Sequence, residues 1–153
     1  MVKNTNYMKR NLFYLLPLLL ILGEACSPKS DNTPIPTPLG SFKGKFRMFT
    51  KNNSTGAVDS TVKDTALILK LTSPYHFAVT GDTATIHAGS KGNFGYDGNF
   101  MSFLDSTYKA GPQAKRHLVG VYQYFYNGTL LQLLRTNSTQ DTILRYDFSK
   151  TSN

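Results

Sequence analysis

The 153-residue sequence contains one cysteine, Cys26, and no tryptophan. A single cysteine excludes an intramolecular disulfide and any zinc site built from several cysteines. Glutamate is absent after Glu24, so a catalytic pair of carboxylates would have to come from aspartates. Four of those aspartates stand at expected turns, where capping the backbone is their ordinary role: Asp82, Asp97, Asp105 and Asp141.

Motifs for hydrolysis or metal binding are also missing. There is no Gly-x-Ser-x-Gly elbow and no His-Glu-x-x-His pair. His76 and His87 fall on expected neighbouring strands, but no third ligand is marked, so each histidine is interpreted as a half-exposed strand residue. The sequence predicts a protein that is not an enzyme, with no metal site and no cofactor.

Acidic residues are few, and the formal net charge is +8. Part of this charge belongs to the N-terminal region, where Lys3, Lys9, Arg10 and Glu24 lie. A basic surface can meet nucleic acid, anionic lipid or acidic glycan. No nucleic-acid-binding motif is present, so nucleic acid is not expected as a partner.

Residues 1–25 have the order of a signal peptide. Basic residues are followed by the apolar run Leu12–Leu22 and then by small residues. The run is too short for a membrane span, which needs about 20 residues. Export into a cell envelope is therefore expected, with the protein held at the outer membrane or on the periplasmic face of the envelope.

The segment Leu22-Gly-Glu-Ala-Cys26 resembles the lipobox of bacterial lipoproteins. In that family a diacylglyceryl group is attached to the cysteine thiol and the chain is cut before the cysteine. Gly23 and Glu24 depart from the family pattern, and ordinary signal cleavage after Gly-Glu-Ala is the alternative. The resemblance implies a membrane anchor through lipid on Cys26.

Residues 26–39 form the expected tether between this anchor and the folded domain. Four prolines and many polar residues favour extended chain: Pro28, Pro34, Pro36 and Pro38. In polyproline geometry the thirteen residues after Cys26 span at most about 40 Å.

Residues 40–153 are predicted to form one all-β domain. Apolar side chains recur at every second position in several segments, for example Leu67, Leu69 and Leu71, while no long stretch has a helical period. Segments 84–88 and 118–126 are also expected to be strands. Gly81-Asp82, Asp97-Gly98 and Asn127-Gly128 are typical of two-residue hairpin turns. About nine strands joined in sequence order indicate an antiparallel up-and-down meander.

Such a meander can protect its edges by closing. A small barrel of eight or nine strands removes both edges, whereas the alternative, a two-sheet β-sandwich, keeps them. The strand near Tyr122 is apolar on both faces, because Tyr122, Tyr124 and Tyr126 alternate with Val121 and Phe125. From the sequence, this suggests a strand near the middle of the barrel or one that faces a partner.

The stretch from Gly40 to Lys150 resembles the lipocalin-like domains of bacterial envelope lipoproteins. The likeness rests on the opening Gly44-Lys45-Phe46, the run of short hairpins and the closing Arg145-Tyr-Asp-Phe. Lipocalins carry tryptophan in the opening motif with a late arginine packed over it, and here Phe46 takes that place. The resemblance implies an up-and-down barrel with a possible apolar cavity, and it implies no particular ligand.

Two functions follow as hypotheses. In the first, the anchored barrel binds a small apolar or amphipathic ligand. In the second, it is a structural or interaction protein of the envelope with a packed barrel and no ligand. The candidate cavity residues of the first hypothesis are Phe46, Leu69, Phe77, Tyr122, Tyr124, Leu133 and Tyr146.

Two surface features add to these hypotheses. Lys43, Lys45 and Arg47 share the outward face of the first strand and could touch anionic lipid or glycan, although they are also typical of a solvated edge. The loop from Tyr108 to Arg116 could cover the mouth of a barrel, or it could be an ordinary long loop.

Overall fold

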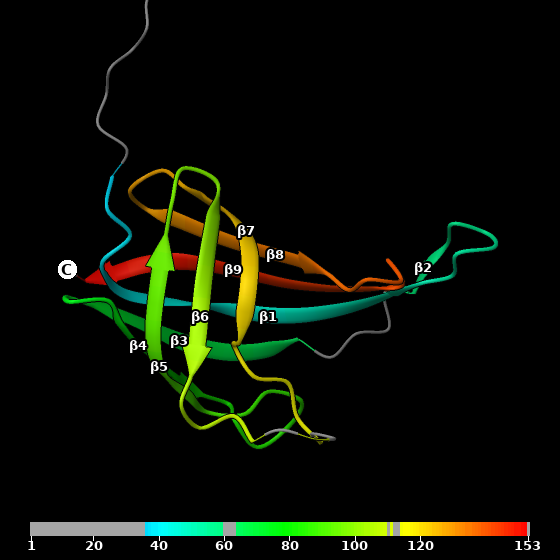
Figure 1. Cartoon of the computed structure of the whole chain (residues 1–153), viewed down its shortest axis with the longest axis horizontal. Helices are drawn as coiled ribbons and strands as arrows, with labels where there is room; N and C mark the ends of the chain where they lie inside the picture. The colour runs from blue at the N-terminus through cyan, green and yellow to red at the C-terminus, as the bar shows by residue number, and fades with distance from the viewer. Residues whose placement is uncertain (1–35, 60–63, 110, 112–113, 153) are drawn as a thin grey trace, which may run out of the picture. The chain divides into compact units, whose positions relative to one another are not determined.

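The computed structural model describes residues 36–59, 64–109, 111 and 114–152 (Figure 1). The predicted signal peptide, Cys26 and most of the predicted tether lie outside the described residues. No helix occurs in the described part of the chain, so none there could cross a membrane.

The described residues form an all-β domain with antiparallel strand pairing throughout its sheet. The strands are β1 (Gly40–Lys51), β2 (Val58–Asp59), β3 (Thr65–Thr72), β4 (His76–Gly81), β5 (Ser90–Tyr96), β6 (Phe100–Asp105), β7 (Gly120–Tyr126), β8 (Leu130–Thr136) and β9 (Thr142–Ser152). Each pairs with its neighbour in the order β2-β1-β3-β4-β5-β6-β7-β8-β9, and β1 also pairs with β9.

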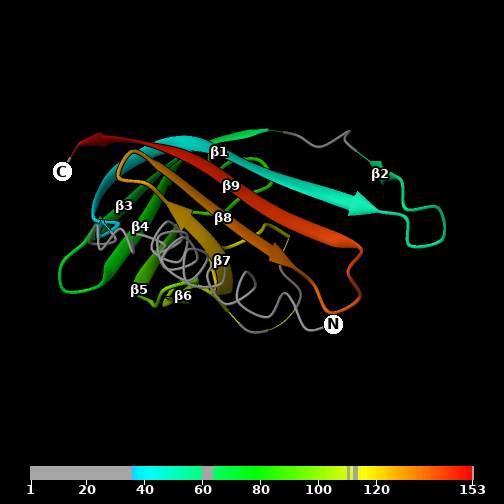
Figure 2. The same ribbon diagram turned by 90° about the horizontal axis from the view of Figure 1, so that it is seen from above.

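The pairing of β1 with β9 closes an eight-stranded up-and-down barrel (Figure 2). The two-residue β2 adds to the far end of β1 at Thr50 and Lys51, outside the closed ring. Gly44 permits the close approach of β1 and β9, because a Cβ there would collide with the carbonyl oxygen of Asp147. Closure confirms the predicted barrel and rules out the sandwich.

The two ends of the barrel differ in their connections. At one end, which we call the short-turn end, three tight turns at residues 73–75, 97–99 and 127–129 join neighbouring strands. At the other, the long-loop end, the connections include residues 82–89, 106–119 and 137–141. The predicted turn at Asn127-Gly128 is confirmed, with Gly128 at a φ of 97° and the Asn127 side chain accepting the Leu130 amide at 2.8 Å.

Two local predictions were wrong. Residues 84–88 are not a strand, and Gly81-Asp82 does not form a two-residue hairpin turn, because an eight-residue loop joins β4 to β5. In that loop His87 makes only an isolated bridge with Arg116, with Ala88 N donating to Arg116 O at 2.8 Å. Pairing with the β6–β7 loop replaces the hairpin that the local alternation predicted.

Aromatic rings fill the middle of the barrel. Phe46 lies 4.8 Å from Tyr146 between ring centres, and Tyr146 lies 5.7 Å from Tyr122. Phe103 continues the series, 5.9 Å from Tyr122 and 5.1 Å from Phe77. Edge and tilted packing at such distances adds to the hydrophobic gain of burial. The interior between these strands is thus occupied by side chains in contact.

Candidate ligand pocket at the long-loop end

A pocket of about 370 Å³ lies at the long-loop end of the barrel. The β6–β7 loop supplies one side of it and the ends of β8 and β9 supply the other. Its lining includes Tyr108, Lys115, Arg116, His117, Arg135 and Leu144. The volume is within the range of small-ligand sites, about 300–1,000 Å³, and the lining combines cations with apolar surface.

Arg135 is the cation that reaches furthest toward the core. It follows the buried Leu131 and Leu133 on the inner face of β8, and its Nη1 donates to the Val119 carbonyl at 2.6 Å. Its guanidinium carbon lies 5.7 Å from the centre of the Tyr122 ring, a cation–π distance. Gly120, at a φ of 94°, leaves room for it, because a Cβ there would lie 2.5 Å from Nη1.

The cations of this pocket have no carboxylate partner among the residues that the structure describes. Lys115 donates from Nζ to the Thr83 carbonyl at 2.7 Å, a neutral acceptor. Arg116 and Arg135 take part in none of the ion pairs found there. Three positive charges at one pocket without a counterion favour the binding of an anion.

Two acidic groups lie beside the pocket, and both are engaged with other residues. Asp141 accepts hydrogen bonds from the Asn137 amide and the Thr142 hydroxyl, two residues of the lining. Asp105 is buried and pairs with His117, with 2.8 Å between Oδ2 and Nδ1. Burial acts to raise the pKa of Asp105, but hydrogen bonds from Thr107 and His117 outweigh it and hold that pKa below its ordinary value. The Asp105 carboxylate therefore fixes His117, and in the described part of the chain neither Asp105 nor Asp141 forms an ion pair with Lys115, Arg116 or Arg135.

Beneath the pocket lies a buried polar chain. His87 is fully buried, its Nδ1 donates to the Ala88 carbonyl at 2.6 Å, and its Nε2 accepts the Tyr146 hydroxyl at 2.9 Å. Burial lowers the pKa of His87 to about 4, so the imidazole is neutral at pH 7. Burial also raises the pKa of Tyr146 well above its ordinary value, while Arg135 and Arg116 oppose this rise.

The Tyr122 hydroxyl is buried and has no hydrogen-bond partner among the described residues. Burial raises the pKa of Tyr122, while the charge of Arg135 and hydrogen-bonding contacts with Tyr146, Arg135 and the Val119 backbone oppose the rise. These contacts fall short of well-formed hydrogen bonds, and Arg135 also lines the pocket. An oxygen atom bound beside Arg135 would therefore approach a buried hydroxyl that has no well-formed partner in the described part of the chain.

The candidate cavity residues all come from inward-facing positions. Tyr124 is half-buried and donates its hydroxyl to the Asp97 carbonyl at 2.8 Å, at the short-turn end. The other six are buried in the hydrophobic core: Phe46, Leu69, Phe77, Tyr122, Leu133 and Tyr146. Their role as ligand contacts stays a prediction, and the ring contacts described above place them against one another.

Two cationic features expected from the sequence lie on the outer wall. Of the stripe on β1, Lys45 and Arg47 both contact Asp64, at 2.9 Å each, and Lys43 is exposed. Arg145, in the closing strand, pairs with Asp147 at 2.8 Å on the outside of β9. It therefore does not pack over Phe46, whose ring neighbours are His87 and Tyr146.

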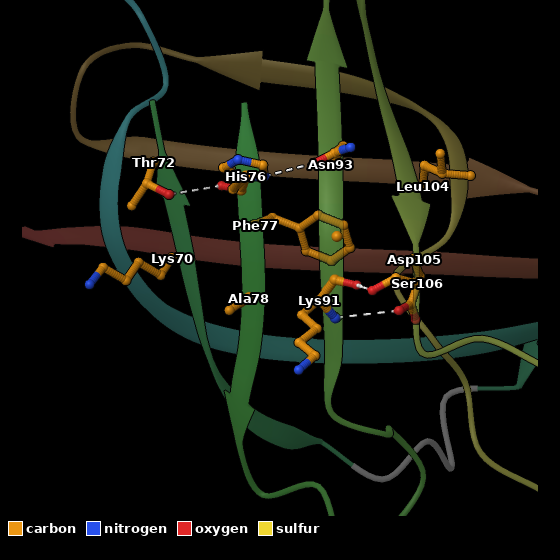
Figure 3. Close-up of a pocket in the computed structure, with 11 residues that line it drawn as sticks. Lys70, Thr72, His76, Phe77, Ala78, Lys91, Asn93, Leu104, Asp105 and Ser106 are labelled. Carbon is orange, nitrogen blue, oxygen red and sulfur yellow. Dashed lines mark hydrogen bonds between the residues drawn. The ribbon is translucent and has the colours of Figure 1, made fainter. Parts of the chain in front are cut away.

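A wider hollow of about 620 Å³ lies on the outside of β3–β6 (Figure 3). Its polar groups are largely paired with one another: His76 Nδ1 and Asn93 Oδ1 lie 2.7 Å apart, and Ser106 donates to the Lys91 carbonyl at 2.8 Å. It is open to solvent and has no buried unpaired group on its floor among the described residues. It is the weaker candidate for a ligand site.

The interpretation of His87 as a half-exposed strand residue was wrong, because His87 is buried in the loop between β4 and β5. Sequence reasoning also missed Arg135 as part of a site. The loop that could cover a barrel mouth does contribute to the pocket through Tyr108, Lys115 and Arg116. The run Lys115-Arg116-His117 was the available signal, since three basic residues in a long loop are unusual without a partner. Comparisons with protein families, with curated proteins and with solved structures found no match.

Proposed function

We propose that this chain is an exported, lipid-anchored envelope protein whose barrel binds a small amphipathic ligand with an anionic head group. The ligand head lies in the pocket at the long-loop end. The observation that carries the proposal is the group Lys115, Arg116 and Arg135, which has no carboxylate partner among the described residues and surrounds a pocket of ligand size. Arg135 beside the Tyr122 hydroxyl, which has no well-formed hydrogen bond in the described part of the chain, supports an oxygen-bearing head group.

The apolar part of the ligand has surface to contact in the same pocket. Tyr108, Val119 and Leu144 belong to its lining. Charge-assisted hydrogen bonds from arginine to a carboxylate or phosphate are about twice as strong as neutral ones. The head group therefore fixes the orientation and the apolar lining adds affinity.

Titration calorimetry tests ligand binding. The full chain in lipid nanodiscs is titrated with octyl phosphate and octanoate, with octanol as the neutral match and empty nanodiscs as the blank. Both anions bind saturably and octanol binds at least tenfold more weakly. Arg135→Gln weakens octyl phosphate binding about tenfold or more, roughly 1.4 kcal/mol, while Lys45→Gln, on the outer stripe, changes it less than about twofold.

Circular dichroism and thermal melts establish that both variants fold. Equal weakening by Arg135→Gln and Lys45→Gln, or no saturable binding of either anion, would contradict the proposal.

Metabolic labelling with a fatty-acid analogue tests the anchor. The wild-type chain takes up label and Cys26→Ala does not, because the thiol is the acceptor, while Ser27→Ala behaves as wild type. If the wild-type chain takes up no label, the lipid anchor is contradicted. Ligand binding is then still tested independently by the calorimetry.

A structural or interaction role without a ligand is the second candidate. The ring-filled middle of the barrel is the observation that favours it. The calorimetry separates the two, because a packed barrel without a ligand gives no saturable heat with either anion.

A further inference from the structure

Six of the ten exposed large apolar side chains in the described part of the chain lie on three adjoining strands. We call their outward face the apolar wall. It consists of Phe100 and Leu104 on β6, Val121 and Phe125 on β7, and Leu130 and Leu134 on β8, with exposures from 37% to 71%.

Strand register makes the apolar wall continuous. Phe100 lies opposite Gln123, which lies opposite Leu134 on β8. Phe125 is the next outward residue of β7 and is diagonal to both Phe100 and Leu134, within reach of large side chains. The apolar side chains therefore form a single patch across the three strands.

The outward positions between the apolar side chains are Ser102, Gln123 and Gln132, and none of them is charged. The outward face of β1, by contrast, carries Lys43, Lys45 and Arg47. A contiguous uncharged apolar patch on an outer surface marks an interaction site, whereas single exposed apolar residues need no explanation.

The chain enters the barrel beside this wall. Pro36, the first described residue, lies next to the β7–β8 turn, because a Cβ on Gly128 would be 4.0 Å from its Cγ. Phe125 and Leu130 flank that turn. Cys26 is ten residues upstream, and ten extended residues reach at most about 35 Å.

We propose that the apolar wall lies against the membrane that holds the lipid anchor. This rests on the anchor of the proposed function and goes beyond it, because it says which face of the barrel meets the lipid. Aromatic and aliphatic side chains without charge are favourable at a membrane interface, where burial removes apolar surface from water. A groove of about 340 Å³ formed by residues of β7, β8 and β9 adjoins the wall, and its lining includes Phe125 and Leu130 as well as Asp147.

Tryptophan fluorescence tests the orientation, because the chain has no tryptophan of its own. Phe125→Trp and Phe100→Trp place a reporter on the apolar wall. Ile68→Trp is the matched control, since Ile68 is an exposed apolar residue on β3, four strands from β7 around the eight-stranded ring. The full-chain variants are reconstituted in phosphatidylcholine–phosphatidylglycerol vesicles that contain brominated phosphatidylcholine.

The expected result is quenching at least threefold stronger at Phe125→Trp and Phe100→Trp than at Ile68→Trp, with the reverse order for iodide in solution. Adding Phe125→Ser and Leu130→Ser to Phe100→Trp reduces the lipid quenching at least twofold. Melting curves show whether each variant folds, and each of the three tryptophan positions is exposed, so the substitutions leave the core intact.

Stronger quenching at Ile68→Trp overturns the proposal in favour of the basic outward face of β1, because Ile68 lies opposite Lys43. No quenching at any position overturns it in favour of a domain held away from the lipid. If quenching is absent and chemical cross-linking gives a species of twice the mass of the chain, the apolar wall contacts a second copy of the chain instead of the membrane. Mass spectrometry of Cys26 reports the anchor separately. If Cys26 carries no acyl group, the same variants are coupled through that single thiol to a maleimide lipid, so that the quenching pattern still decides the orientation.

Discussion

Two groups of cations on this barrel have similar side chains but different neighbours. The first group lies on the outward face of β1, which we call the β1 wall. There Asp64 contacts both Lys45 and Arg47 at 2.9 Å, and Asp147 lies 3.7 Å from Arg47. At the long-loop end, Arg116 and Arg135 have no carboxylate partner in the described part of the chain. A paired cation contributes little attraction for an external anion, whereas an unpaired one keeps its full field.

The comparison shows that a charge pattern read along one strand overestimates the free charge of that strand. Lys43, Lys45 and Arg47 are the most regular basic pattern in the sequence, yet two of the three are paired within the chain. The prediction that this stripe contacts anionic lipid or glycan stays a prediction. The cations around the pocket are scattered between a loop and β8, and only the fold gathers them.

The largest expected effect concerns the acid sensitivity of the long-loop end. His87 has a pKa of about 4 in the folded chain, against about 6.5 when unfolded. Between pH 6.5 and 4, His87 is therefore protonated in the unfolded chain and neutral in the folded chain. Stability falls by about 3 kcal/mol between pH 6.5 and 4 from this residue and levels off below pH 4.

Urea unfolding at a series of pH values measures this loss. His87→Gln flattens the slope between pH 6.5 and 4, although it also lowers stability at pH 7 because Tyr146 loses its acceptor. His76→Gln, at an exposed strand end, is the matched control and keeps the wild-type slope. A His87→Gln variant with the full wild-type slope would place the titrating group elsewhere.

An intermediate effect follows from removing the space for Arg135. Gly120→Ala puts a Cβ at a φ of 94° and 2.5 Å from the Arg135 Nη1, so backbone strain of about 1–2 kcal/mol and displacement of the guanidinium are expected together. Gly56→Ala is the control, since Gly56 lies in the turn after β1, away from the pocket, and has a φ of 71° with open space around the Cβ position.

Chemical unfolding and octyl phosphate calorimetry separate the two consequences. Both alanine variants lose similar stability, and only Gly120→Ala loses binding, by about fivefold or more. Similar binding in the two variants would show that the position of Arg135 is irrelevant to the pocket.

The smallest effect belongs to the β1 wall. Hydrogen bonds from Arg47 and Lys45 hold the pKa of Asp64 below its ordinary value. A depressed carboxyl pKa contributes stability above the unfolded pKa, about 3.9, and loses it as the pH falls below that value. Because the group is fully exposed, Asp64→Asn lowers the melting temperature at pH 7 by no more than about 2 °C.

Melting curves in low and in molar salt check this point, since salt screens exposed pairs and removes the difference between Asp64→Asn and wild type. In the wild type, the loss of stability between pH 6.5 and 4 reports His87 at the long-loop end. A further small loss below pH 4 reports Asp64 on the β1 wall. A large and salt-independent effect of Asp64→Asn would reverse the comparison between them.

Much of the fold could be predicted from local patterns. The alternation of Leu67, Leu69 and Leu71 gave β3 its inward face, and all three are buried. Residues 84–88 have a similar alternation and are not a strand, because their backbone bonds to the β6–β7 loop instead of to a neighbouring hairpin. Local periodicity carries no information about which partner the backbone finds.

The site was less predictable than the fold. The face of β7 that carries Tyr122 points inward and the face that carries Val121 and Phe125 points outward, although both are apolar in the sequence. Only the closure of the ring decides this choice. The pocket needs Arg116 and Arg135 from distant segments, and neither belongs to a motif.

The sequence by itself determined most of the strands and their antiparallel order, because side-chain alternation and turn residues act over two to four positions. The tertiary structure decided which cations are paired and which polar groups are buried. Asp64 contacts Lys45 and Arg47, 19 and 17 positions away in the sequence, because β1 pairs with β3. His87 bonds to Tyr146, 59 positions away, and this contact needs β9 to take its place in the closed ring. In the described part of the chain, the same closure brings the cations of the long-loop end together without a carboxylate partner.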